Sequence, residues 1–368
     1  MRALVSGGRT GGHLIPGLAI YREIKKRNID CLYIMSTFDL NYPVSEIVEK
    51  GDRYLLPLKN ISRKLSFKTP VYILKIIINF FKVLSHIRKF NPDFIVITGG
   101  YISNPAALSA VFLRKPLYIV EQNSVAGVTN RIYAPFSRKI FTSFPETKKI
   151  PAKKSVFTGN PSLFHNKISR SRAKSFFNLD EFNNIIGITS GSQGSKTINE
   201  CIIKILPELL NKNIGVIWSA GSVEYKKFQV SGEISRLECD FPNLRLYQFI
   251  ERMDSFFSAS NCVISRAGAS SISELIYYEC PAILIPIRFS PDNHQALNAY
   301  YLISNNCGIA VSEDELSPAL LSDKLFKMLE NLPFYIENIR KISSQRPQFS
   351  EKVITDCIIA NYSAYMTK

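Results

Sequence analysis

Several kinds of chemistry are missing from this sequence of 368 residues. Its seven cysteines are odd in number and include no Cys-x-x-Cys pair, so we expect neither a disulfide framework nor a zinc site and infer a reducing cytosol. There is no GxxxxGK[ST] loop and no Asp-x-Asp motif, which disfavours ATP hydrolysis and metal-dependent sugar transfer. We therefore expect no metal and no other cofactor. Because an apolar strand is expected from residue 2, we also expect no signal peptide.

Acidic residues are scarce in the first half of the chain. Residues 1–160 hold 25 lysines and arginines against 9 aspartates and glutamates, whereas residues 161–368 hold 21 of each. A basic half of this kind indicates a polyanionic partner, either nucleic acid or an anionic membrane. An AT-rich genome would also raise the lysine content, but it would not confine the lysines to one half. A nucleic-acid-binding protein would have base-stacking aromatic residues interleaved with its lysines, and this pattern is missing. We therefore favour an anionic membrane surface as the partner and expect no nucleic acid.

What the sequence does contain is a regular alternation of apolar strands and amphipathic helices. It predicts an α/β protein with parallel sheets, and the length fits two domains. We predict an N-terminal domain over residues 1–160, a C-terminal domain over residues 161–349, and a last helix at 350–365 that crosses back onto the first domain. The expected strands are 2–6, 31–35, 94–98, 117–121, 139–143, 155–158, 185–189, 214–219, 244–249, 262–265 and 282–286, and the expected helices of the first half are 14–27, 71–89, 103–113 and 128–135.

The first strand leads into the most informative loop, Ser-Gly-Gly-Arg-Thr-Gly-Gly-His at residues 6–13. Glycine lets backbone approach a ligand closely, and the N–H groups at the start of the following helix favour anionic or polar oxygens. His13 is one of only four histidines, and a titratable side chain on such a loop is a candidate catalytic base. The alternative is a tight turn with a surface histidine. A second glycine loop follows the strand at 185–189.

The predicted helix at 71–89 is unusually apolar. Its polar residues form one narrow stripe, and the apolar arc is wider than a surface helix needs. We expect a face that enters an anionic membrane surface, while its charged and titratable residues argue against a span. The alternative is a buried helix whose lysines reach solvent along their stems. The residues expected at the membrane are Lys75, Ile77, Phe80, Phe81 and Lys82.

In the second half, residues 265–274 read Ser-Arg-Ala-Gly-Ala-Ser-Ser-Ile-Ser-Glu between a strand and a helix. Small and hydroxyl residues at a helix start suit a diphosphate, and Glu274 could accept hydrogen bonds from a ribose diol. The alternative is a serine-rich helix cap with a favourable early glutamate. Amide and carboxylate side chains at 292–298 suit sugar hydroxyls, although Asp292 could simply cap a helix. The acidic run at 313–315 is expected to be a solvated helix start.

Five motifs together resemble the MurG family of N-acetylglucosaminyltransferases, which convert lipid I to lipid II in peptidoglycan synthesis. They occur in family order over nearly the whole chain, and the set is far more specific than any one of them. The motifs are Gly8–Ala19 (GRTGGHLIPGLA), Thr98–Tyr101 (TGGY), Glu121–Gly127 (EQNSVAG), Gly191–Gly194 (GSQG) and Ser265–Glu274 (SRAGASSISE).

The resemblance implies two Rossmann-like domains of the GT-B type, with the active site in the cleft between them. The donor would be UDP-GlcNAc, held by the C-terminal domain. Ser192 and Ala269–Ser271 would face its diphosphate, Glu274 its ribose, Ile250 its uracil and Gln295 its sugar hydroxyls. The full run of substrate-binding residues that the Ser265–Glu274 motif implies is Ala269, Ser270, Ser271, Ile272 and Ser273. In the N-terminal domain, Thr10, Gly11, Gly12 and Asn123 would complete the cleft, and Tyr101 would contact the acceptor.

The acceptor implied by the resemblance is the C4 hydroxyl of the muramoyl sugar of lipid I, carried on undecaprenyl diphosphate. His13 would be the base of a metal-independent, inverting transfer that forms a β-1,4 link. Such an enzyme would be peripheral, on the cytoplasmic face of the bacterial inner membrane, which also accounts for the basic first half. Two residues depart from the family pattern. Leu163 stands where the family usually has an arginine that contacts the donor, and Arg9 stands where many relatives have a small residue.

Two other classes of enzyme are alternatives to a MurG-type transferase. A glycolipid synthase of the same fold, acting on a diacylglycerol-type acceptor, is the alternative that stays open. A nicotinamide dehydrogenase is disfavoured because neither glycine loop reads GxGxxG in register with its strand, and no acidic residue follows the first loop at the expected spacing of about 20 residues.

Overall fold

The computed structural model describes residues 1–57, 69–191, 194–230 and 232–366. The chain divides into two compact units. Unit 1 holds Met1–Leu163 together with Pro347–Lys368, and unit 2 holds Phe164–Arg346. Each unit has a sheet of parallel strands flanked by helices, which confirms the α/β class. Across the described ranges, no helix is both long and apolar enough to cross a membrane.

Unit 1 is built on a seven-stranded sheet in the order β3-β2-β1-β4-β5-β6-β7. Its strands are β1 (Arg2–Ser6), β2 (Asp30–Ser36), β3 (Arg53–Leu56), β4 (Phe94–Ile97), β5 (Leu117–Glu121), β6 (Lys139–Thr142) and β7 (Ser155–Phe157). Its helices include α1 (Gly11–Lys26), α2 (Thr69–Phe90), α3 (Asn104–Phe112), α4 (Val128–Tyr133) and the C-terminal α14 (Ser350–Met366).

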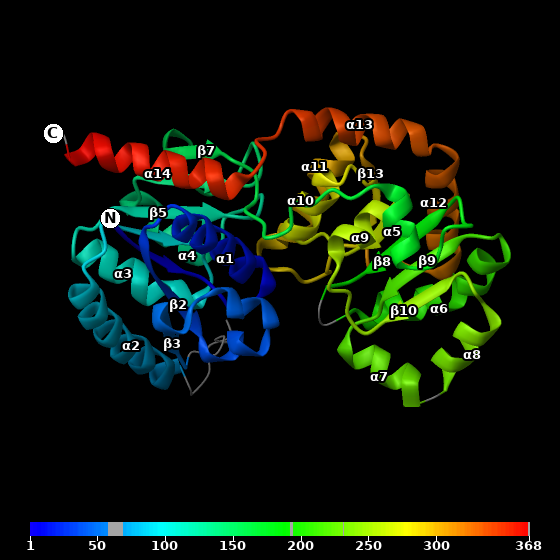
Figure 1. Cartoon of the computed structure of the whole chain (residues 1–368), viewed down its shortest axis with the longest axis horizontal. Coiled ribbons are helices and arrows are strands. Elements are labelled where there is room, and N and C mark those ends of the chain that lie inside the picture. The colour runs from blue at the N-terminus through cyan, green and yellow to red at the C-terminus, as the bar shows by residue number, and fades with distance from the viewer. Residues whose placement is uncertain (58–68, 192–193, 231, 367–368) are drawn as a thin grey trace. The chain divides into compact units, whose positions relative to one another are not determined.

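The sheet of unit 1 has a buried core on the side that α2 and α3 cover. Leu4 of β1 pairs in register with Leu32 of β2 and Ile95 of β4, and all three join a buried cluster with Val83 and Ile87 of α2. Helix α14 packs against α1, and Figure 1 shows α14 and α2 on opposite sides of this sheet. Burial on both faces explains why these strands are continuous apolar runs.

Unit 2 repeats the plan with a six-stranded sheet in the order β10-β9-β8-β11-β12-β13. Its strands are β8 (Ile185–Thr189), β9 (Gly215–Ser219), β10 (Leu244–Tyr247), β11 (Cys262–Ser265), β12 (Ala282–Leu284) and β13 (Gly308–Ala310). Its helices are α5 (Arg170–Phe176), α6 (Lys196–Asn211), α7 (Ser222–Val230), α8 (Glu233–Asp240), α9 (Met253–Ala259), α10 (Ala269–Tyr277), α11 (His294–Ser304), α12 (Pro318–Glu330) and α13 (Leu332–Ser344).

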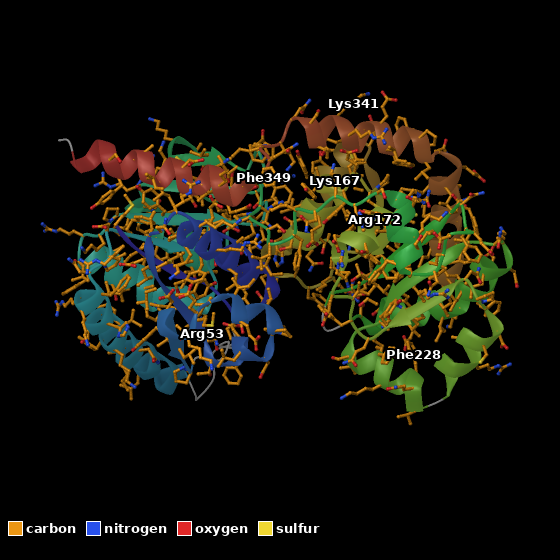
Figure 2. The ribbon with its side chains drawn as sticks, viewed as in Figure 1. Arg53, Lys167, Arg172, Phe228, Lys341 and Phe349 are labelled. Atoms are coloured by element: carbon orange, nitrogen blue, oxygen red, sulfur yellow. The ribbon has the colours of Figure 1, made fainter. Side chains whose placement is uncertain are left out.

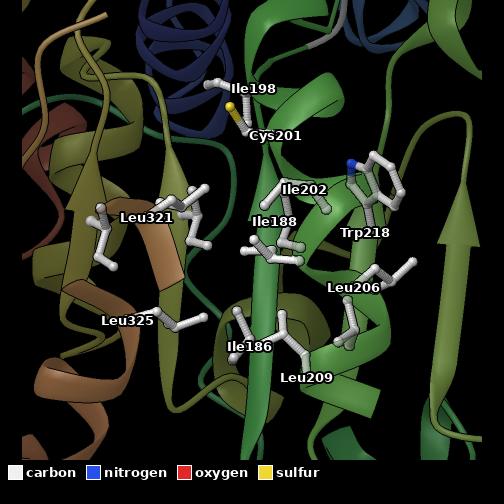
Figure 3. Packing of buried hydrophobic residues seen from close by; sticks show 14 of the residues in the cluster. Ile186, Ile188, Ile198, Cys201, Ile202, Leu206, Leu209, Trp218, Leu321 and Leu325 are labelled. Atoms are coloured by element: carbon white, nitrogen blue, oxygen red, sulfur yellow. The ribbon is translucent and has the colours of Figure 1, made fainter. Parts of the chain in front are cut away.

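Helix α6 shows how the sequence builds the core of unit 2. Ser195 caps it by accepting a hydrogen bond from the N–H of Ile198, and apolar residues then recur every three or four positions. The resulting apolar face packs on Ile186 and Ile188 of β8 (Figure 3). Nearby, the indole of Trp218 is fully buried, and its N–H donates to Asn199 Oδ1 at 3.2 Å, so its polar atom is satisfied.

The structure departs from the sequence prediction at several ends and edges. Strands β3 and β13 were not predicted, and both are short strands at the edge of a sheet. Figure 2 labels Arg53, which opens β3. Helix α1 starts at Gly11 rather than at residue 14, so His13 lies inside its first turn.

The acidic run at 313–315 forms a turn rather than a helix start, which corrects part of the expectation, while Asp314 and Glu315 are exposed as expected. Helix α12 begins only at Pro318, and the half-buried Glu313 forms an ion pair with Arg266. Helix α11 begins at His294, after a short 3-10 turn that contains Asp292. The pairing of Glu313 joins residues 47 positions apart, so no local pattern reveals it.

Candidate active site

The carboxyl ends of β1, β4 and β5 bring three motifs of unit 1 together around His13. The Nδ1 atom of His13 lies 2.8 Å from the carbonyl oxygen of Thr98 and 3.1 Å from Oε1 of Gln122. The amide nitrogen of Gln122 donates to the carbonyl of Val120, which fixes Oε1 as the atom that faces the imidazole. Both partners of Nδ1 are therefore acceptors, so in the neutral imidazole the proton lies on Nδ1 and the lone pair on Nε2.

Glycines make room for this imidazole. Gly99 and Gly100 follow β4 with positive φ angles of 90° and 74°, and both lie against the ring. A Cβ on Gly100 would come within 3.1 Å of the ring's Cδ2 atom, and one on Gly99 within 3.3 Å of Cε1. The Thr98 hydroxyl donates to the carbonyl of His13 at 2.7 Å. The TGGY motif thus fixes both the ring and the backbone of His13.

Tyr101 is half-buried directly after these glycines, and burial raises the pKa of its hydroxyl to about 12. It therefore stays protonated at neutral pH and can donate a hydrogen bond. Thr10 is exposed, and its side chain caps none of the N–H groups in the first turn of α1. Gly11 is exposed and Gly12 half-buried. The start of α1 is thus available to polar oxygens from outside.

Glu121 organises the loop that carries Asn123. Its side chain is fully buried, and Oε1 accepts the N–H of Asn123 at 2.9 Å. Oε2 accepts the N–H of Gly127 at 2.9 Å and the side-chain amide of Asn130 at 2.8 Å. The side-chain amide of Asn123 also donates to Oε1, at 3.4 Å. A buried carboxylate with four N–H donors is well satisfied and fixes the turn from β5 into α4. Asn123 itself is half-buried beside it.

Asp39 ties the first glycine loop to the end of β2. Its carboxylate is fully buried and accepts the backbone N–H of Arg9 at 2.6 Å and that of Ser36 at 2.8 Å. Burial raises the pKa of Asp39, although these two hydrogen bonds act in the opposite direction. A Cβ on Gly8 would come within 2.1 Å of Oδ2, so glycine is required there. Arg9 has a φ of 73° and its guanidinium lies 4.8 Å from the centre of the Phe38 ring.

In unit 2, the N-terminal turns of α10 carry most of the residues expected to bind the donor. Ser270, Ser271, Ser273 and Glu274 are half-buried, whereas Ala269 and Ile272 are buried. No hydrogen bond or ion pair joins the Glu274 side chain to another described residue, and burial raises the pKa of its carboxyl to about 7. The hydroxyl of Ser273 is also buried without a partner in the described part of the chain.

The other residues expected to bind the donor follow other strands of the same sheet. Ile250 is buried in the loop after β10. Gln295 is nearly buried at the start of α11, and its Oε1 accepts the N–H of Ile287 at 3.0 Å, which leaves its NH₂ group to face another acceptor. Ser192 lies outside the described residues.

Arg266 connects three of the loops at this edge of unit 2. Its guanidinium donates to Ser195 Oγ at 2.6 Å, to the carbonyl of Ile285 at 3.1 Å and to the Glu313 carboxylate. Burial acts to raise the pKa of Glu313, but the hydrogen bonds from the Arg288 N–H and from Arg266 outweigh it and lower that pKa. The Glu313 carboxyl is therefore charged at neutral pH, and its ion pair with Arg266 fixes the edge around the start of α10.

Comparison with known proteins shows the family to which this chain belongs. Residues 3–142 match the glycosyltransferase family 28 N-terminal domain, and residues 185–353 match the C-terminal domain of the same family. A Thermosipho africanus UDP-N-acetylglucosamine–N-acetylmuramyl-(pentapeptide) pyrophosphoryl-undecaprenol N-acetylglucosamine transferase is 34% identical over 89% of this chain and 92% of its own. The transferase of the same name from Bacillus subtilis is 32% identical over 94% of each chain. The chain belongs to this transferase family.

The family assignment also agrees with the fold. The crystal structure of Acinetobacter baumannii MurG superposes with a TM-score of 0.75 and 23% identity, covering 98% of this chain and 99% of that one. The expected GT-B fold with two Rossmann-like domains is thereby confirmed. The residues matched to the transferase motifs fall into two sets, one around His13 in unit 1 and one around α10 in unit 2.

Sequence reasoning missed several residues that hold the site together. Gln122 lies inside the Glu121–Gly127 motif. Its position directly after a strand end was the one signal in the sequence that it could contact His13. Arg266 also stands inside a motif, but its partners lie up to 71 residues away. Asp39 follows β2 by three residues, and only the convergence of parallel strand ends at one edge could have suggested it. Leu163, at the departure from the transferase pattern, is buried.

Proposed function

We infer that this chain transfers GlcNAc from UDP-GlcNAc to the C4 hydroxyl of the muramoyl sugar of lipid I, which yields lipid II. The observation that carries the inference furthest is the orientation of His13, whose Nδ1 faces two acceptors, so that the neutral ring has its lone pair on Nε2. The relatives that match 89% and 94% of this chain are named as N-acetylglucosamine transferases that act on N-acetylmuramyl-(pentapeptide) pyrophosphoryl-undecaprenol.

In the proposed reaction His13 is the general base. Its Nε2 takes the proton of the acceptor hydroxyl while O4 attacks C1 of GlcNAc, and the bond from C1 to the diphosphate oxygen breaks on the opposite face, which inverts the anomeric carbon. Tyr101, Asn123 and the start of α1 would bind acceptor or donor oxygens, because they are polar and accessible near the imidazole.

The donor would be held by unit 2. The N–H groups at the start of α10 and the hydroxyls of Ser270 and Ser271 suit a diphosphate that gains charge as it leaves, which is electrostatic catalysis. Ser192 would add to this set. Glu274 would accept hydrogen bonds from the ribose diol, Ile250 would offer backbone to uracil, and Gln295 would bind sugar hydroxyls through its NH₂ group.

The test is transfer of labelled GlcNAc from UDP-GlcNAc to a short-chain lipid I analogue in the presence of EDTA. We expect turnover in the wild type and a loss of kcat of at least about a hundredfold in His13→Ala. Near-full kcat in that variant would refute the general-base role. Binding of UDP-GlcNAc without any turnover would instead favour another acceptor, such as a diacylglycerol.

We also propose that unit 1 binds the cytoplasmic surface of the bacterial inner membrane as a peripheral protein. Exposed apolar side chains on α2 and α3 support this, since Phe81 and Phe112 are each 61% exposed and Ile77 and Ile78 lie beside them on α2. Lys82 is exposed next to Phe81. Phe80 is half-buried and its ring contacts that of Phe112, so it would hold Phe112 in position rather than enter the membrane itself. The side chain of Lys75 lies outside the described residues.

The membrane proposal has its own test. Wild-type protein should float with vesicles that contain phosphatidylglycerol, and Phe81→Asp with Phe112→Asp should abolish flotation while transfer to a water-soluble acceptor persists. Undiminished flotation of that double variant would refute a role for this face.

A further inference from the structure

Side chains from two helices hold the turn that carries Tyr101. The hydroxyl of Thr129 in α4 donates to the carbonyl of Gly100 at 3.1 Å. Asn104 is the first residue of α3, and its side-chain amide and its backbone N–H both donate to the carbonyl of Tyr101, the side chain at 3.1 Å. The same side-chain amide donates to the hydroxyl oxygen of Thr129 at 3.1 Å. Asn104 and Thr129 thus form one connected pair around the turn.

The turn needs this support because two glycines come directly before Tyr101. Gly99 and Gly100 have positive φ angles and no Cβ, so many other conformations are open to the backbone there. Thr129 is buried, and a hydrogen bond that is shielded from water is stronger than an exposed one. The carbonyls of Gly100 and Tyr101 belong to the two peptide groups that flank the Cα of Tyr101. Holding both groups fixes the direction in which the Tyr101 side chain leaves the backbone.

The Tyr101 side chain has one polar atom that the protein itself does not use. Its ring packs against the buried core of unit 1, while its hydroxyl makes no hydrogen bond to another described residue. Gly100 lies against the imidazole of His13, so this hydroxyl belongs to the same edge of the sheet as the proposed base. A half-buried hydroxyl of this kind is suited to a polar group of a ligand.

We propose that Asn104 is a positioning residue for the transfer, which together with Thr129 places the Tyr101 hydroxyl against the sugar of the acceptor. The inference rests on the proposed function, because it needs Tyr101 to bind the acceptor beside His13. It assigns no substrate contact to Asn104 itself. A hydrogen bond to the substrate weakens steeply with distance and angle, so a small shift of the turn impairs it. Asn104 therefore affects how the acceptor is bound and aligned, and not how UDP-GlcNAc is bound.

The main experiment is a double-mutant cycle between Asn104 and Tyr101. The kcat/KM for a short-chain lipid I analogue is measured at saturating UDP-GlcNAc in the wild type, Asn104→Ala, Tyr101→Phe and the double variant. We expect Asn104→Ala to lower this kcat/KM at least about tenfold, with the KM for UDP-GlcNAc unchanged. Once the Tyr101 hydroxyl is absent, Asn104→Ala should cause almost no further loss. Losses that multiply in the double variant would overturn the proposal.

Two comparisons separate positioning from a general loss of stability. Asn361→Ala is the matched control, because this side-chain amide donates to a backbone carbonyl within α14 and should leave kcat/KM unchanged. Thr129→Val removes the hydroxyl that holds Gly100, whereas Thr129→Ser keeps one. We expect the valine variant to lower kcat/KM for the acceptor and the serine variant to keep most of it. Equal losses in the two would overturn the proposal, and this pair decides the matter if Asn104→Ala does not fold.

The outcomes also separate this inference from the proposed function. If the wild type transfers no GlcNAc to the analogue, the proposed function fails, and the positioning role fails with it. If the wild type is active but Tyr101→Phe keeps its full kcat/KM, the proposed function stands and the positioning role is overturned. A higher KM for UDP-GlcNAc alone in Asn104→Ala would assign the turn to donor binding and would also overturn it.

Discussion

Replacing Glu121 by glutamine tests whether one buried carboxylate holds the loop of Asn123. The carboxylate accepts four N–H hydrogen bonds, from the backbone and the side chain of Asn123 on one oxygen and from Gly127 and Asn130 on the other. A glutamine has one acceptor oxygen. In its better orientation it keeps the bonds to Gly127 and Asn130 and turns its NH₂ group toward the N–H of Asn123. A buried donor without an acceptor costs about 1–3 kcal/mol, and the two remaining bonds lose their charge assistance. We therefore expect Glu121→Gln to lower the free energy of unfolding by at least about 2 kcal/mol.

The assay is calorimetric melting, which resolves the transitions of two units if they melt separately. For a unit of this size each 1 kcal/mol lowers Tm by about 2–4 °C, so Glu121→Gln should lower the transition of unit 1 by at least about 4 °C. Glu146→Gln is the matched control, because Glu146 is exposed and makes no hydrogen bond in the described residues. A decrease no larger than that of the control would refute the assignment of the loop's stability to this carboxylate.

Three further outcomes follow from the same geometry. Gln122→Ala removes one of the two acceptors of the Nδ1–H of His13, and we expect kcat to fall about tenfold with little change in the KM for UDP-GlcNAc, measured by steady-state transfer. Asp39→Asn leaves the N–H of Arg9 or of Ser36 without an acceptor, and thermal melting should show a loss of about 1–3 kcal/mol together with a lower kcat. The pKa of Glu274 is raised to about 7, and its ionised form is the stronger acceptor for a ribose diol. UDP-GlcNAc, whose diphosphate does not titrate in this range, should therefore bind more tightly as pH rises from about 6 to about 8, and calorimetric titration of Glu274→Gln should show a flatter profile.

The strands were predictable where burial makes them continuous apolar runs. β1, β5 and β8 match their predicted ranges because each is buried on both faces. β3 and β13 were missed because edge strands of four and three residues carry too few buried positions to stand out from loops. The start of α1 was placed three residues late because glycines disfavour helix by propensity, while the fold uses Gly11 and Gly12 to leave the helix start open.

The site was predictable in its motifs but not in its supports. The glycine loop and His13 stand together in the sequence, so their chemistry could be inferred locally. Asp39 and Gln122 reach that loop from other strands, 30 and 109 residues away from the atoms they bind. Such contacts depend on which strand ends lie at the same edge of the sheet, and this order is a property of the topology rather than of any short pattern.

Arg266 shows how much of the proposed diphosphate site in unit 2 must depend on neutral groups. Its guanidinium lies just before α10, where a free cation would attract a diphosphate, but the carboxylate of Glu313 already neutralises it. The MurG pattern has a further arginine where this chain has Leu163, which carries no charge. The N–H groups at the start of α10 and the hydroxyls of Ser270 and Ser271 are then the groups left to stabilise the leaving UDP. Such N–H and O–H dipoles stabilise the leaving UDP only if the fold already holds them in the right orientation, because a neutral dipole attracts an anion only at short range. Arg266 therefore acts as the residue that fixes the surrounding loops, and its ion pair with Glu313 favours a rigid edge over a strongly positive one.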